Sequence, residues 1–253
     1  MNGTGDFYDP IAPAYDPPTI VTGEEEIAED VRFYRALARE IDGPTLEVGV
    51  GTGRIYLELL ADGIDIDGID VSSAMIDQLR EYAASCDLDP SVWVDDLLTF
   101  APEREYDLVY APEEILNFFP SMADQRTALE RVHDALAPDG RFATNMGVPQ
   151  FETIAENDGR TLEQHIEADS GHYRIERTAH LEDEIEQLAR IEREVYCDGE
   201  LVGERETMMS LISKRQCELL FELAGFSDWQ VYGGFERDPL SSSDQEMVWV
   251  VEA

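Results

Sequence analysis

The segment TLEVGVGTGR, residues 45–54, constrains the fold of this chain more than any other feature of the sequence. It begins with a short apolar run, and glycines then occupy every second position, at Gly49, Gly51 and Gly53. Because glycine has no Cβ atom, a turn of this kind between a strand and a helix lets the backbone approach a ligand and points amide groups at it. The segment therefore predicts a ligand site directly after a buried strand.

The spacing of these glycines disfavours a nicotinamide or flavin site. A G-x-G-x-x-G motif counted from Gly49 places Arg54 at its sixth position, and one counted from Gly51 places Tyr56 there. The third glycine of that motif, which lets helix and strand pack closely, is missing in both registers. A Lys-Ser/Thr pair, which a P-loop requires, is missing as well.

The order of the elements predicts an α/β fold with a doubly wound parallel sheet. Strand-like segments alternate with helical ones as far as residue 149, and alternation of this kind implies a parallel sheet covered on both faces. The five expected strands are TLEVGV, IDGIDVS, VWVDD, YDLVYAP and RFATNMGVP. A helix is expected from Ser121 to Leu136, and helical periodicity is also present from Gly23 to Ile41.

The pattern changes after the fifth strand. From Thr161 to Ser213 the chain shows long polar strands with alternating hydrophobicity, and Asp198-Gly199 is a hairpin signal between two of them. We therefore expect an antiparallel β insertion in the Rossmann-like sheet. The predicted division is an N-terminal lid and helix at 1–42, a core at 43–150 and 214–253, and an insertion at 151–213 that caps the acceptor.

The charge of the chain restricts its partners. There are 56 acidic residues against 18 basic ones, for a formal net charge of −38. Such a field repels nucleic acid and anionic membranes, so neither is expected as a partner. Because the acids are dispersed along the chain, they favour adaptation to high salt, a halophilic character, over a cation-binding surface, which stays the alternative.

The sequence lacks the patterns typical of membrane-spanning, secreted and metal-binding proteins. No apolar run is long enough for a membrane span, and the first residues do not resemble a signal peptide, so a cytoplasmic location is expected. The three cysteines are far apart and lack metal-ligand spacing. They are expected to be reduced thiols, and no metal site is predicted.

The arrangement Glu47-x-Gly49-x-Gly51-x-Gly53 resembles the first motif of class I S-adenosylmethionine-dependent methyltransferases. The resemblance covers roughly residues 40–150 and 214–253, and it includes the fourth-strand and fifth-strand motifs in the expected order. It implies S-adenosyl-L-methionine as the cofactor. Glycine amides suit the carboxylate of its methionine end, and Glu47 suits the ammonium.

Two further motifs of the resemblance follow the second and third strands. Asp70 stands where the family places an acid on the ribose hydroxyls, and Asp96 with Leu97 stands where an acid and an apolar residue meet the adenine. Asp95 adjoins Asp96, but strand alternation is expected to send Asp95 to the other face. All of these assignments are implied by the resemblance.

The acceptor site is implied by likeness to small-molecule N-methyltransferases of the glycine/sarcosine and amino-sugar types. Tyr8 and Tyr15 resemble the lid of those enzymes, and Tyr15 is the candidate for a residue at the methyl-transfer site. The loop after the fourth strand supplies further candidates for the acceptor pocket: Glu113, Glu114, Asn117 and Phe118. Amino-sugar relatives carry a histidine near Phe118, so this departure weighs against an amino-sugar acceptor.

The predicted function is methyl transfer to a nitrogen or oxygen of a small molecule, by a monomer or a homodimer. Two alternatives remain open on the sequence. One is a protein methyltransferase, which a flat open groove would favour. The other is a non-catalytic module that binds S-adenosylmethionine, which an acceptor pocket filled by side chains would favour.

Overall fold

The structure of the protein, a computed structural model, describes residues 12, 20, 27–168 and 171–253. Its larger sheet has seven strands in the order β10-β11-β5-β4-β1-β2-β3. These strands are β1 (Thr45–Val48), β2 (Ile66–Asp70), β3 (Ser91–Val94), β4 (Tyr106–Ala111), β5 (Leu136–Gly147), β10 (Asp228–Tyr232) and β11 (Glu246–Glu252). Strands β1 to β5 run parallel, and β11 pairs antiparallel with both β5 and β10.

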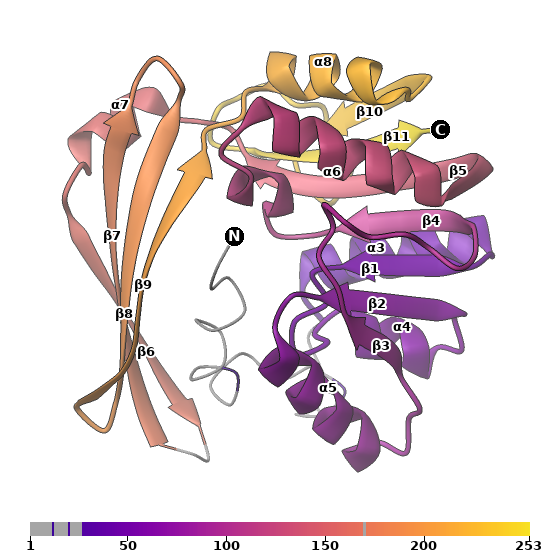
Figure 1. Ribbon diagram of the computed structural model, residues 1–253, viewed down its shortest axis with the longest axis horizontal. Helices are drawn as coiled ribbons and strands as arrows, with labels where there is room; N and C mark the ends of the chain where they lie inside the picture. Colours follow the sequence, from indigo (N-terminus) through magenta and orange to yellow (C-terminus); the bar gives the residue numbers. More distant parts are fainter. Residues whose placement is uncertain (1–11, 13–19, 21–26, 169–170) are drawn as a thin grey trace.

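Helices cover both faces of this sheet, as the alternating pattern predicts (Figure 1). One core cluster packs helices α6 and α8 against the sheet, and the other packs α3, α4 and α5. Strand β1 is buried along its whole length because it lies at the centre of the sheet, between β4 and β2. The helices are α3 (Glu29–Ile41), α4 (Tyr56–Ala61), α5 (Ser73–Ser85), α6 (Met122–Ala135) and α8 (Lys214–Ala224), with a 3-10 turn η2 (Ile115–Phe118).

A second sheet follows β5, after the short helix α7 (Phe151–Glu156). It is antiparallel, in the order β6-β7-β8-β9, and its strands are β6 (Thr161–Ala168), β7 (Gly171–Asp183), β8 (Leu188–Cys197) and β9 (Glu200–Ser210). The predicted hairpin turn lies between β8 and β9, where Asp198 and Gly199 both have positive φ, as a type I′ turn requires. Figure 1 shows this sheet standing beside the larger one, and β9 contacts η2.

The predicted fold class is confirmed, and the differences from the sequence analysis lie at the edges of elements. In the periodic segment from Gly23, helix α3 begins at Glu29, with Ala28 as its N-cap. The Ser121 side chain caps α6 by accepting a hydrogen bond from the Asp124 amide, so Ser121 precedes the helix. Within the described residues, no helix is long and apolar enough to cross a bilayer.

Candidate active site

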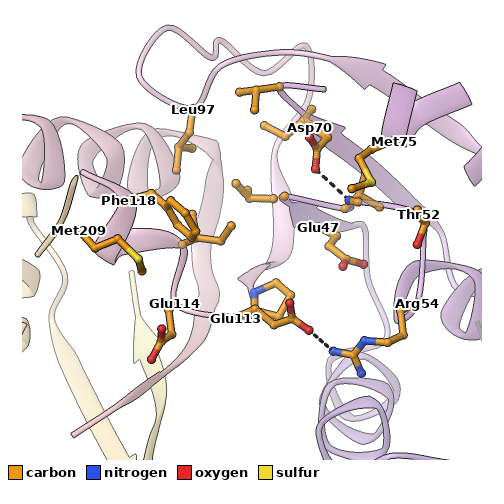
Figure 2. A pocket seen from close by; sticks show the side chains of 18 of the residues that line it. Glu47, Thr52, Arg54, Asp70, Met75, Leu97, Glu113, Glu114, Phe118 and Met209 are labelled. Atoms are coloured by element: carbon orange, nitrogen blue, oxygen red, sulfur yellow. Dashed lines mark hydrogen bonds and ion pairs between the residues drawn. The ribbon is translucent and has the colours of Figure 1, made fainter. Parts of the chain in front are cut away.

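A cavity of about 1120 Å³ lies between the carboxyl ends of the parallel strands and the second sheet. Residues that follow β1, β2, β3 and β4 form one side of it, and residues of β6, β7, β8 and β9 form the other. Figure 2 shows a close view of this cavity, with side chains from several of these elements turned toward one space. Ligands of doubly wound sheets bind at this edge, so the position matches the sequence prediction.

The glycine loop lies on the floor of the cavity with every glycine at positive φ. Gly49 and Gly51 have φ of 74° and 53° and line the cavity. At Gly49 a Cβ atom would lie 2.5 Å from Ile115 Cδ1, whereas at Gly51 it would meet nothing within 4 Å. Gly53 is not among the lining residues, and a Cβ there would lie 2.8 Å from Leu79 Cγ. Gly53 therefore serves close packing of the loop on α5.

Asp70 ties the end of β2 to the glycine loop. Its Oδ2 accepts a hydrogen bond of 2.9 Å from the Gly51 amide, and its Oδ1 accepts one of 2.8 Å from the Ser72 amide. Burial raises the pKa of this carboxyl, and the surrounding backbone amides oppose that effect. A carboxylate has about four acceptor positions, so these bonds leave room for hydroxyl donors of a ligand.

Both acids that follow β3 line the cavity, together with Leu97. The expectation that alternation sends Asp95 to the other face is wrong, because β3 ends at Val94 and alternation stops with it. Asp95 Oδ1 accepts from the Asp96 amide at 2.8 Å, and Asp96 Oδ1 accepts from the Leu98 amide at 3.0 Å. The turn that these bonds stabilise brings both carboxyls to the same wall.

Glu47 is a buried acid that faces the cavity from the middle of the sheet, with only 2% of its surface exposed. The Tyr110 hydroxyl donates to its Oε2 at 2.6 Å. Burial raises the pKa of Glu47 to about 8, although this hydrogen bond and the charge of Arg54 both lower it. The carboxyl is thus protonated at neutral pH in this structure, and a ligand ammonium beside it would favour the ionised form.

The loop after β4 has an unusual backbone. Glu113 and Glu114 are consecutive residues with φ of 58° and 61°, a region that residues other than glycine rarely adopt. Asn145 of β5 holds both of them: its Oδ1 accepts from the Glu113 amide at 3.2 Å, and its carbonyl accepts from the Glu114 amide at 3.0 Å. Glu114 Oε1 accepts from the Gly147 amide at 3.0 Å. Strain of this kind is concentrated at ligand sites, and both glutamates line the cavity.

Arg54, Asn145 and Glu246 line the cavity but were not singled out in the sequence. Arg54 Nη2 lies 2.6 Å from Asp30 Oδ2 and 2.5 Å from Glu113 Oε1, the latter pair marked by a dashed line in Figure 2. Asn145 Nδ2 donates to Glu246 Oε1 at 2.5 Å, and burial raises the pKa of Glu246. Arg54 directly follows the glycine loop and was accessible to sequence reasoning, whereas Glu246 reaches the site only through the pairing of β11 with β5.

The predicted acceptor residues divide into three groups. Glu113, Glu114 and Phe118 line the cavity, and Figure 2 labels all three. Asn117 does not line it: the residue is 7% exposed, and its Oδ1 has no hydrogen-bond partner within the described residues. Tyr8 and Tyr15 lie outside the described residues.

Within the described residues, no group of three or more His, Cys, Asp and Glu side chains is arranged to hold a metal ion. His133 packs edge-on against Phe226, with the ring centroids 5.2 Å apart, in keeping with a packing role. His165 and His172 lie on neighbouring strands, with Nδ1 of the first 3.4 Å from Nε2 of the second.

Comparison with protein families gives one match, to a family model described as a methyltransferase domain, over residues 46–142. This range contains the glycine loop, Asp70, Asp96 and the strained loop after β4. The chain contains a methyltransferase domain. The predictions of a methyltransferase, and of S-adenosylmethionine as the cofactor of its domain, are thereby confirmed.

Solved structures extend the likeness of the methyltransferase fold to almost the whole chain. An S-adenosylmethionine-dependent methyltransferase from Clostridium acetobutylicum matches with a TM-score of 0.74 at 14% identity, over 92% of this chain and 94% of that one. The CcbJ methyltransferase from Streptomyces caelestis matches with a TM-score of 0.73 at 22% identity, over 98% and 97%. The sugar N-methyltransferase KedS8 from a Streptoalloteichus species matches with a TM-score of 0.70 at 16% identity, over 90% of this chain and 88% of that one. No match to a curated protein was found.

Proposed function

We propose that the protein transfers a methyl group from S-adenosylmethionine to a nitrogen or oxygen atom of a small molecule. The observation that carries the proposal is a single cavity lined on one side by the glycine loop, Asp70 and Asp96, and on the other by the second sheet. One side suits a nucleoside-containing cofactor, and the other leaves a surface for an acceptor. Solved structures of similar fold include an amino pentose methyltransferase and a glycopeptide N-methyltransferase.

The size of the cavity supports two ligands. Sites for one small molecule typically have a volume of about 300–1,000 Å³, and this cavity has about 1120 Å³. An acceptor that enters beside the cofactor is therefore small. This favours a metabolite over a protein substrate, and an enzyme over a module that only binds the cofactor.

The proposed cofactor contacts follow the geometry of the cavity. The backbone of Gly49 and Gly51 lets the methionine end come close, while their own amides donate to the Ile69 carbonyl and to Asp70 Oδ2. Glu47 faces the ammonium of that end, and Asp70 accepts from the ribose hydroxyls. Asp96 and Leu97 meet the adenine, with Asp95 beside them on the same wall. These roles are what the resemblance implies. They are supported by the lining of the cavity, which includes all of these residues.

Methyl transfer is an in-line displacement at an activated carbon, so the protein mainly aligns donor and acceptor. Alignment can supply up to about 7–11 kcal/mol of the barrier. The acidic wall formed by Glu113, Glu114 and Glu246 suits an acceptor amine, because carboxylates accept hydrogen bonds from N–H groups and can take the proton that the nitrogen gives up. From the sequence alone, Tyr15 is proposed as the residue at the methyl-transfer site and Tyr8 as a residue of the acceptor pocket.

The remaining parts of the proposal rest on the sequence. The division of the chain into lid, core and capping insertion, action in the cytoplasm at high salt, and a monomeric or homodimeric state are proposed together. The dispersed acids and the net charge of −38 support the absence of a nucleic-acid partner.

Thermal unfolding with S-adenosylhomocysteine tests the cofactor site. A ligand at a hundred times its dissociation constant stabilises the folded state by about 2.7 kcal/mol, which for a chain of this size corresponds to a rise in melting temperature of roughly 5–10 °C. Asp70→Ala should abolish most of the rise, whereas Asp77→Ala, an exposed acid on α5, should keep it. A shift with NADH and none with S-adenosylhomocysteine would contradict the proposal.

Turnover with labelled S-adenosylmethionine then separates an enzyme from a binding module. The panel consists of amines, amino acids and hydroxylated metabolites, tested in concentrated potassium chloride. Transfer of label to a small molecule supports the proposal. Transfer to protein alone supports the protein methyltransferase instead.

A further inference from the structure

A row of arginines crosses the second sheet on the face that lines the cavity. Arg177 on β7 pairs directly with Arg193 on β8, and Arg193 pairs with Arg205 on β9. Arg177 and Arg193 line the cavity, as does Ile175, which lies two residues before Arg177 on the same face. Two guanidinium groups thus face the cavity side by side from the wall opposite the glycine loop.

Neither of these two arginines is neutralised by the protein. Most arginines of the chain form an ion pair with a carboxylate, as Arg54 does with Asp30. Within the described residues, Arg177 and Arg193 have no ion-pair or hydrogen-bond partner. The charge of Glu114 raises the pKa of Arg177, but by less than the charge of Arg193 lowers it. In a chain with 56 acids and 18 bases, two neighbouring cations that line one cavity without a carboxylate partner are unexpected.

The pairing of Arg177 with Arg193 brings two positive charges together and so destabilises the second sheet. Like charges directly opposite each other on neighbouring strands destabilise a sheet. Arg177 is an exposed residue, so its lost hydration is partial; the pKa of its guanidinium is nevertheless lowered, first by the surrounding protein and second by the charge of Arg193. An anion placed between the two groups would remove the repulsion and compensate for the lost hydration.

We infer that Arg177 and Arg193 form a subsite for an anionic group, a carboxylate or a phosphate, carried by the methyl acceptor. The inference rests on the proposed function for the identity of the ligand as an acceptor. Guanidinium groups bind both kinds of oxyanion through paired N–H···O bonds, which makes arginine the residue suited to this recognition. The acceptor therefore presents its methylated atom to the glycine-loop side, near Glu113, and its anion to the second sheet.

Anion-dependent thermal stabilisation tests the subsite without any need to know the acceptor. Potassium phosphate at pH 8, or potassium acetate, replaces potassium chloride at constant ionic strength, and the melting temperature is recorded with and without S-adenosylhomocysteine. The proteins compared are the parent, Arg177→Gln, Arg193→Gln and the control Arg215→Gln. Arg215 is an exposed residue of α8, outside the cavity, and is likewise without a carboxylate partner in the described part of the chain.

The parent should gain stability in phosphate or acetate, and the anion needed for half of the effect should rise about tenfold or more in Arg177→Gln and in Arg193→Gln. Arg215→Gln should behave as the parent. A larger effect of phosphate identifies a phosphorylated acceptor, and a larger effect of acetate identifies a carboxylic acid. No effect of either anion, or equal effects in all four proteins, would overturn the inference.

The two proposals fail separately in this experiment. Stabilisation by S-adenosylhomocysteine with no anion effect removes the subsite and leaves the methyltransferase proposal intact. An arginine-dependent anion effect without any response to S-adenosylhomocysteine supports the subsite as an anion site and contradicts the proposed cofactor.

Discussion

Replacement of Glu47 by Gln should make the protein more stable at alkaline pH and should change how its stability depends on pH. Glu47 is buried in the centre of the sheet, and burial raises its pKa to about 8 from an ordinary value of 4.5. Glutamine has nearly the same shape, and its side-chain oxygen can still accept the hydrogen bond from the Tyr110 hydroxyl. The substitution therefore removes the titration and keeps the packing.

The sign follows from proton linkage. Between pH 4.5 and 8, folded Glu47 holds a proton that the unfolded chain has lost, so the stability of the parent falls as the pH rises through this window. Each pH unit costs about 1.4 kcal/mol, and the whole difference of roughly 3.5 pKa units corresponds to about 5 kcal/mol. Above pH 8 both states are ionised and the loss is complete. In Glu47→Gln no group titrates at this position, so this contribution to the pH dependence of stability is absent at every pH.

Urea unfolding of both proteins in concentrated potassium chloride measures the difference directly. The free energy of unfolding of Glu47→Gln minus that of the parent should grow by about 2.7 kcal/mol between pH 5.5 and 7.5. Titrations of groups that do not interact with Glu47 are common to both proteins and cancel. Tyr110→Phe should extend the pH-dependent window upward, because the hydrogen bond from Tyr110 lowers the pKa of Glu47. A difference that stays constant with pH would refute the argument from burial.

Two further predictions concern the charge of the chain and the N-terminal tyrosines. Circular dichroism across a potassium chloride series should show a gain of structure with ionic strength, because salt screens repulsion among 56 acids; full structure and an unchanged melting point in dilute buffer would favour the cation-binding surface instead. Tyr15→Phe should lower kcat for the true acceptor with little change in affinity for S-adenosylhomocysteine, the pattern of an interaction made mainly in the transition state; unchanged turnover would reduce Tyr15 to an anchor.

Local sequence patterns were enough to predict much of the scaffold. The glycines after β1, the alternation of strands and helices and the Asp198-Gly199 turn each depend on residues close together in the chain, so their conformations follow from neighbouring residues alone. The same patterns placed Glu47, Asp70 and Asp96 at one edge, because the carboxyl ends of parallel strands lie together.

One prediction based on strand period failed where β3 ended, and Asn117, which the resemblance implied for the acceptor pocket, lies outside the cavity lining. Strand alternation separated Asp95 from Asp96, but both residues follow β3 and line the cavity. Asn117 lies within a loop that does line the cavity, yet it turns into the interior because the left-handed residues at Glu113 and Glu114 redirect the backbone into η2. A sequence period does not extend past the end of a strand, and it does not describe such a turn.

By itself, the sequence determined the methyltransferase scaffold, the order of its motifs and the acidity of its surface. Only the tertiary structure decided which distant residues meet. Glu246 reaches Asn145 through the pairing of β11 with β5, and Arg177 faces Arg193 through the register of β7 on β8. The physical reason is that a local pattern fixes which face a side chain occupies, whereas strand register, set by turns and by packing of the whole sheet, fixes its neighbour.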